Sequence, residues 1–171
     1  IGLDVAELFE TESTVEPGDV LVMSHKERVL KKSSSPYAEK IIGIVSGAPA
    51  LVFEGSDLKI VAQPNRFESG RKPPVALAGR IPVKVSRENG AIHVGDYITS
   101  SSTPGVAMKA TKAGMTIGVA LEDFAGNGNE EGEILVFLNI GEKNVGAVIN
   151  ELQQRDKDFQ RRLELLEKRR W

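Results

Sequence analysis

The chain has 171 residues, which suits one main domain with an extension, and its formal net charge is −2 with both signs interspersed. This balance gives no argument for nucleic acid or an anionic membrane surface as a partner, and no apolar run approaches the roughly 20 residues of a membrane-spanning helix. There is no cysteine, so disulfides and thiolate metal sites are excluded.

An acidic pair stands in the first segment, DVAELFE at 4–10. Asp4 followed three residues later by Glu7 resembles a capping box, in which the first side chain caps a helix and the second closes the cap. The residues alone therefore predict an exposed, acidic helix start. Three residues apart, the two carboxylates share a face only in a helix or a turn.

The residues up to 141 contain short segments rich in β-branched side chains, separated by Gly, Pro, Asn or Ser. Aromatic residues make up only 5% of the chain, so aliphatic side chains carry the core. Several short strands with regular turns predict a mainly β domain over 1–141, either a barrel or a sandwich. The expected strands are GDVLVM, KIIGIV, ALVFEG, LKIVAQ, PVALAG, RIPVKVS, GVAMKA, MTIGVAL and EILVFLNI.

Two short motifs add detail to this β domain. Pro82 within RIPVKVS has no N–H to donate, which predicts that this strand lies at an edge or a bulge. Asn89-Gly90 stands between two strand-like runs and predicts a tight hairpin.

An internal echo runs through the β segments and predicts a duplicated fold with pseudo-two-fold symmetry. Four pieces recur in the same order with unequal spacers. Each piece alone is common turn chemistry, so the shared order carries the prediction. The pairs are VEPGDVLV (15–22) with IHVGDYIT (92–99), SSSP (33–36) with SSSTP (100–104), IIGIV (41–45) with TIGVA (116–120), and LVFEG (51–55) with LVFLNIG (135–141).

The period of the apolar residues changes in the last part of the chain. Apolar residues there follow alternating steps of four and three with charged flanks, which is typical of a coiled coil. We therefore predict a coiled-coil trimerisation helix over 142–171. Ile149, Asp156, Leu163 and Arg170 take the a positions of the heptad, and Val145, Leu152, Phe159 and Leu166 take the d positions.

The stretch RLELLE, 162–167, predicts the number of strands in the coiled coil. Arg162 falls at g, Leu163 at a, Leu166 at d and Glu167 at e, an order that resembles the short trimerisation motif of parallel three-stranded coiled coils. In a trimer the Arg162 stem would cover the apolar seam while its guanidinium pairs with a glutamate of a neighbouring helix. Asp156 weakens the seam and is expected to fix its register.

The β region also resembles a known family. The segments DVAELFE, VEPGDVLV, IIGIVSGAPAL, PVALAGRIPVKVSRENGAIHVGDYITSSSTPGVAMKA and TIGVALED resemble a β-rich module near the C-termini of bacteriophage tail fibres and of fibre-like bacterial surface proteins. The resemblance covers nearly all of residues 3–140, and in that family a helical or coiled-coil segment typically follows the module. It implies a location in a virion tail fibre or an extracellular appendage.

A more distant resemblance is to the autoproteolytic intramolecular-chaperone domain of phage tail spikes. That family opens with a similar Asp-x-Ala-Glu-x-Phe/Tyr pattern, and the match here lies mostly in the first ten residues and in IIGIVSG. The resemblance implies a scissile bond between Leu3 and Asp4, with Asp4 and Glu7 as the processing pair. We nevertheless predict no self-cleavage, because capping explains the same two residues.

Other candidate sites have little support in the sequence. His25 and His93 have no metal-ligand spacing around them, and the serine clusters are not in a nucleophile elbow, so we predict no metal, no cofactor and no active site. The expected function is a structural and assembly module of a trimeric fibre. A homotrimer is the expected partner state, with other fibre proteins or a cell-surface receptor as further partners. A self-cleaving chaperone domain and a receptor-binding tip are the alternatives.

Overall fold

The computed structural model describes residues 3–54, 57–60, 67–126, 130–143, 156–157 and 159–162, with the side chains of 57–60 excepted. Twelve strands lie in these residues. The first six are β1 (Leu3–Leu8), β2 (Glu10–Thr11), β3 (Val20–Met23), β4 (Val29–Lys32), β5 (Ile41–Val45) and β6 (Leu51–Glu54). The others are β7 (Asp57–Ile60), β8 (Pro74–Val85), β9 (Tyr97–Ser100), β10 (Ala107–Lys109), β11 (Gly114–Ala120) and β12 (Gly132–Lys143).

The mainly β prediction is confirmed, and each of the nine expected segments overlaps a strand. PVALAG and RIPVKVS are two halves of one strand, β8. Four strands, β1, β2, β4 and β9, lie outside the nine expected segments. They are short or carry charged residues, so tertiary pairing decides their conformation more than their composition does.

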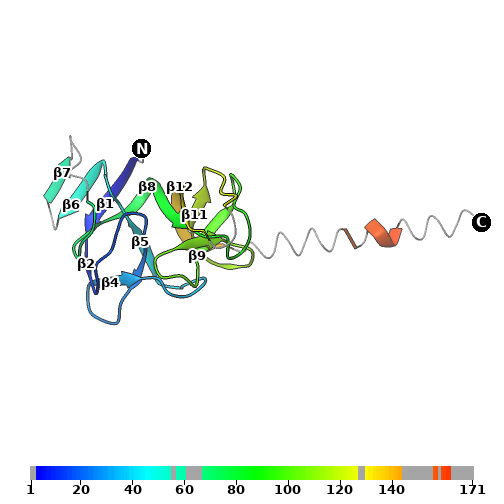
Figure 1. The fold of residues 1–171 in the computed structure, drawn as a ribbon, viewed down its shortest axis with the longest axis horizontal. Coiled ribbons are helices and arrows are strands. Elements are labelled where there is room, and N and C mark those ends of the chain that lie inside the picture. The colour runs from blue at the N-terminus through cyan, green and yellow to red at the C-terminus, as the bar shows by residue number, and fades with distance from the viewer. Residues whose placement is uncertain are drawn as a thin grey trace, which may run out of the picture.

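All the described strands belong to one sheet, in the order β10-β9-β11-β12-β8-β5-β3-β4-β2, with β1, β6 and β7 branching from β8. The prediction of a barrel or a sandwich was wrong, because the strands form one branched, curled sheet. The long strand β8 explains the difference, since its first half pairs with β1 and β5 and its second half with β12. In Figure 1, β6 and β7 lie at one end of this body and β9 and β11 at the other, with β5 and β8 between them.

Two units of the sheet share the same strand order. β3 lies between β4 and β5, followed by the first half of β8, just as β9 lies between β10 and β11, followed by β12. The outer strand of each unit also makes a short parallel pairing, β4 with β2 in one unit and β10 with the end of β8 in the other. The register agrees as well: Leu21 faces Lys32 and Gly43, and Ile98 faces Lys109 and Gly118.

Two of the four echo pairs occupy equivalent places in these units, the Gly-Asp segments and the IIGIV and TIGVA segments. The other two do not. SSSP at 33–36 follows β4, whereas SSSTP at 100–104 begins at the end of β9. The LVFEG strand β6 pairs with β1 and β7, whereas β12 takes the place of the first half of β8. The sequence similarity of these two pairs reflects residue types that are common in turns and strands, not equivalent positions in the fold.

Each unit begins with the same Gly-Asp turn. The glycines have positive φ, 83° at Gly18 and 92° at Gly95, a conformation that residues with a Cβ rarely adopt. The aspartate carboxylates close the turns by accepting a hydrogen bond from the backbone N–H three residues earlier. These bonds are Glu16 N to Asp19 Oδ2 at 2.9 Å and His93 N to Asp96 Oδ2 at 2.8 Å.

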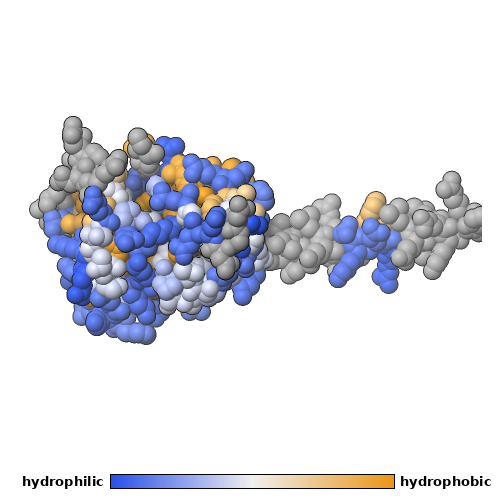
Figure 2. Space-filling view, in the orientation of Figure 1, coloured by the Kyte–Doolittle hydropathy of each residue, from blue (hydrophilic) through white to orange (hydrophobic). Residues whose placement is uncertain are grey.

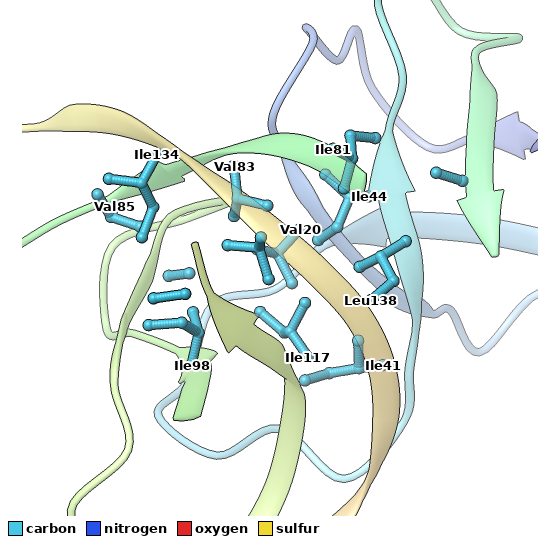
Figure 3. Close-up of a cluster of buried hydrophobic side chains, with 14 of the residues drawn as sticks. Val20, Ile41, Ile44, Ile81, Val83, Val85, Ile98, Ile117, Ile134 and Leu138 are labelled. Atoms are coloured by element: carbon cyan, nitrogen blue, oxygen red, sulfur yellow. The ribbon is translucent and has the colours of Figure 1, made fainter. Parts of the chain in front are cut away.

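The larger core cluster joins the two units. Figure 3 shows Val20 and Ile44 of the first unit packed with Ile117 of the second and with the β8 residues Ile81 and Val83. A second, smaller cluster belongs to the first unit alone and consists of Val15, Leu21, Leu30, Val45 and Val75. Because β3 buries one face in each cluster, its sequence VLV is apolar without alternation.

The two motif predictions have different outcomes. Pro82 pairs with Leu135 of β12, and no strand pairs with it on its other side within the described residues, so its placement at a locally open edge is confirmed. Asn89-Gly90 does form a turn, in which Gly90 N–H donates to the Arg87 carbonyl at 2.8 Å. The predicted hairpin was wrong, because β8 and β9 do not pair with each other and β9 instead joins β10 and β11.

Gly118→Ala tests the close packing of β11 on β12. A Cβ at Gly118 would overlap the Phe137 carbonyl oxygen, which is backbone and has little room to move. We expect a loss of about 1–3 kcal/mol in the free energy of unfolding, as in other overpacked sites. Gly141→Ala is the matched control, because nothing lies within 4 Å of its added Cβ. Equal stability of the two variants in urea denaturation would contradict this packing.

Candidate functional site

Asp4 lies in the middle strand of a three-strand group, so the predicted helix start at this position was wrong. β1 pairs in parallel with β6 on one side and antiparallel with β8 on the other. Asp4 and Ala6 point inward and are buried, as expected from the alternation of a strand. Two strand neighbours outweigh the local capping pattern, because pairing satisfies the backbone groups along the whole segment.

The Asp4 carboxyl is buried with one oxygen unpaired. Asp4 is only 3% exposed, and its Oδ2 has no hydrogen-bond partner. Burial raises the pKa of Asp4 above its ordinary value, while hydrogen bonds from the Ser46 side chain and from the backbone act in the opposite direction. An unpaired buried carboxylate oxygen costs free energy, so folding favours the protonated form of this group.

Gly79 of β8 lets the backbone of Asp4 come close. The two residues are paired in the sheet, and Gly79 has a φ of 111°. A Cβ at Gly79 would overlap the Leu3 carbonyl oxygen and lie 2.7 Å from the Asp4 Cα. Gly79 therefore allows the close approach of β1 that fixes the position of Asp4. This role could not be predicted from the sequence, because a glycine in an apolar strand does not show which residue it will pair with.

Glu7 does not join Asp4 in a common site. Glu7 lies opposite Phe53 of β6 and Val75 of β8. Because side chains alternate along a strand and Glu7 is three residues from Asp4, the two carboxylates point to opposite sides of β1. Glu7 is partly exposed and Asp4 is buried. The pair Asp4–Glu7 is therefore not arranged to exchange a proton directly.

A cluster of charges around Asp19 is the other notable polar feature. The Asp19 carboxylate is 1% exposed and contacts Lys32 Nζ and Lys84 Nζ, each at 2.8 Å. Burial lowers the pKa of Lys84, but hydrogen bonds to Asp19 and Glu16 outweigh this and raise it above its ordinary value. Lys84 belongs to β8, so this ion cluster fastens the first Gly-Asp turn to the strand that both units share.

The second Gly-Asp turn has a smaller version of this cluster. Asp96 contacts Lys109 Nζ at 2.8 Å, and the desolvation that raises the pKa of Asp96 is outweighed by hydrogen bonds from Lys109 and His93. Both clusters were missed at the level of sequence, although the repeated Gly-Asp segments marked where they lie. In each cluster a lysine side chain contacts the aspartate that closes the turn.

The predicted trimerisation residues are only partly described. Asp156, Phe159 and Arg162 are helical and exposed, and Phe159 exposes 59% of its surface. Ile149, Leu152, Leu163, Leu166 and Glu167 lie outside the described residues. The coiled coil therefore stays a prediction, with an exposed aromatic side chain at one of its d positions.

Neither histidine marks a metal site within the described residues. His25 and His93 are both exposed and lie in different turns. In the part of the chain that the structure describes, no group of three or more His, Asp or Glu side chains is placed to hold a metal ion. Among the same residues there is no helix of the length and apolar character needed to span a membrane.

Comparison with known proteins gives a likeness of fold. No protein-family model matches the chain, and no curated protein matches it either. The C-terminal fragment of bacteriophage phi29 gene product 12 is similar with a TM-score of 0.51 and 17% identity, over 80% of this chain and 100% of that fragment. The pre-mature form of gene product 12 is similar with a TM-score of 0.54 and 16% identity, and the match covers 81% of this chain but only 22% of that longer chain.

Asp4→Asn tests the buried carboxyl through the pH dependence of stability. Because the folded-state pKa of Asp4 is raised, its contribution to stability is greatest below the ordinary value and is lost as pH rises through the folded pKa. The asparagine variant carries no such charge. Its free energy of unfolding relative to the wild type should therefore increase as the pH rises above the ordinary aspartate pKa of about 4. A difference that does not change with pH would contradict the burial of an ionisable Asp4.

Proposed function

We propose that the chain is a structural and assembly module of a trimeric fibre or appendage, of the kind found on phage tails. The observation that carries the proposal is the likeness of fold to the C-terminal fragment of bacteriophage phi29 gene product 12, over the whole of that fragment. The sequence independently resembles a β-rich module near the C-termini of phage tail fibres. Its location would be a virion tail or a comparable extracellular appendage.

The proposed role is to bring three chains together in register. The heptads after β12 supply the association helix, and exposed Phe159 is the kind of side chain that a neighbouring helix covers. A single helix of this length is marginally stable in water, so the β domain and the helix would support each other in the trimer. No catalytic step is needed for this role.

Leu163→Asp tests the proposed trimer. Wild-type protein should have the mass of a homotrimer in light scattering at micromolar concentration. Leu163→Asp places three carboxylates in one apolar layer, at a cost on the order of several kcal/mol, and should dissociate the trimer. Glu164→Ala, at a solvent-facing heptad position of the same helix, is the control and should leave the mass unchanged.

Self-cleavage at the Leu3–Asp4 bond is the second candidate function. The buried carboxyl of Asp4, with its raised pKa, is the observation that favours it, because a group of this kind suits general acid chemistry. The opposite orientation of Glu7 on β1 weighs against a concerted pair. The assembly role needs no cleavage, and we propose that the chain remains intact.

Intact-mass spectrometry of a chain extended upstream of Ile1 separates the two candidates. We expect a single uncleaved species after prolonged incubation at several pH values. Appearance of a product that begins at Asp4, and its loss in Asp4→Asn, would instead assign self-processing. If that product were also lost in Glu7→Gln, Glu7 would take part in spite of its orientation in this fold.

A further inference from the structure

One outward face of the sheet carries a continuous row of residues across five strands. Register places Tyr97 of β9 opposite Val119 of β11, and Val119 opposite Phe137 of β12. Phe137 in turn lies opposite Arg80 of β8, and Arg80 opposite Leu3 of β1. Directly paired residues on neighbouring strands project to the same side, so these five side chains form one row, which we call the outer row.

Apart from Arg80, the side chains of the outer row are apolar, and all but the partly exposed Val119 are exposed. Leu3 is 59% exposed and Phe137 49% exposed. Leu77 of β8 is exposed as well, and it is the unpaired residue where the register between β1 and β8 shifts. Tyr97 and Leu121 are also exposed. Figure 2 shows orange side chains gathered where Figure 1 places β8, β11 and β12. Contiguous apolar surface of this kind marks a contact surface in soluble proteins.

Arg80 gives this face a specific chemical requirement. It stands between Leu3 and Phe137 in the outer row, is exposed, and makes no hydrogen bond or ion pair among the described residues. Its methylene stem fits an apolar contact while its guanidinium needs an anion. Aromatic residues and arginine are the types enriched in the centres of protein interfaces. The face therefore suits a protein surface that offers a carboxylate among apolar side chains.

The arrangement of the chain favours another copy of the same chain as the partner of this face. Phe137 lies on β12, which ends at Lys143, and the heptad positions begin two residues later at Val145. A three-stranded coiled coil would hold the ends of three β12 strands near one axis. The sheets of neighbouring copies would then meet at high effective concentration, so a second contact between them forms with little further loss of entropy.

We infer that the face formed by the outer row and Leu77 is the contact surface between copies of this chain. This inference rests on the proposed trimer and extends it from the helix to the β domain. Arg80 of one copy pairs with a carboxylate of its neighbour, and Phe137 is buried in that contact. The other possible occupant, an unrelated fibre protein or receptor, is an outcome of the test.

Single-cysteine labelling tests this surface, because the chain has no cysteine of its own. Leu77→Cys places a thiol in the face, and Met23→Cys, on β3 of the first unit, is the control with similar exposure. A maleimide dye should label Leu77→Cys about tenfold more slowly in the assembly than in copies dissociated by dilution or by Leu163→Asp, because only dissociated copies expose the thiol. Met23→Cys should label at the same rate in both states.

The outcomes distinguish the inference from the proposed function. A wild-type protein that is a monomer at every concentration would overturn the trimer and this contact together. A wild-type trimer in which Leu77→Cys labels as fast as in single copies would overturn the contact alone and leave the face to another protein. As a second readout, Phe137→Ser should weaken the trimer while its circular dichroism stays that of a folded β protein, and Met23→Ser should leave the trimer unchanged.

Discussion

The sharing of β8 by two strand units is the constraint on which the rest of the structure depends. One strand of 12 residues supplies the neighbour of β5 with its first half and the neighbour of β12 with its second half. The larger core cluster fills the space between the units, and Lys84 ties the first Gly-Asp turn to the same strand. Because β1 rests on Gly79 of β8, the position of Asp4 follows from this strand as well.

The surface that we propose for association follows from the same arrangement. β1 and β12 lie on the two sides of β8, so their outward residues join those of β8 in one continuous face. Within one copy nothing among the described residues covers Phe137 or Leu77, although both are large apolar side chains. The chain thus exposes large apolar side chains in two places, on this face and at Phe159 of the helix, and the assembly that we propose would cover both.

Strand content was predictable from the sequence because β-branched runs between turn residues leave few alternatives. The Gly-Asp segments were informative for the same reason, since a positive φ and a closing carboxylate are local properties. The topology was not predictable in this way. SSSP and SSSTP are similar in sequence but lie at the ends of strands that are not equivalent. Pro82 lies in β8, whose first half is paired on both sides, whereas Pro82 itself is paired only with β12.

The candidate sites show the same limit of sequence reasoning. Asp4 and Glu7 fit the sequence pattern of a helix cap. The segment forms a strand because it pairs with β6 and β8, whose residues are 46 or more positions away in the sequence. The strand β12 is apolar on both faces, so its sequence alone does not tell which face the core covers. Only the register of β12 on β8 and β11 shows that Phe137 is outside and Val136 inside.

The joining of the two units through β8 is tested most directly by the free energy of unfolding of Asp19→Asn, measured beside Asp96→Asn. Asp19 is almost completely buried and holds two lysines, one of them on β8, whereas Asp96 is partly exposed and holds one. We expect a single transition in both variants, with a loss of roughly 3–5 kcal/mol for Asp19→Asn and about 1 kcal/mol for Asp96→Asn. Equal losses, or a second transition in the wild type, would show that the units do not depend on this connection.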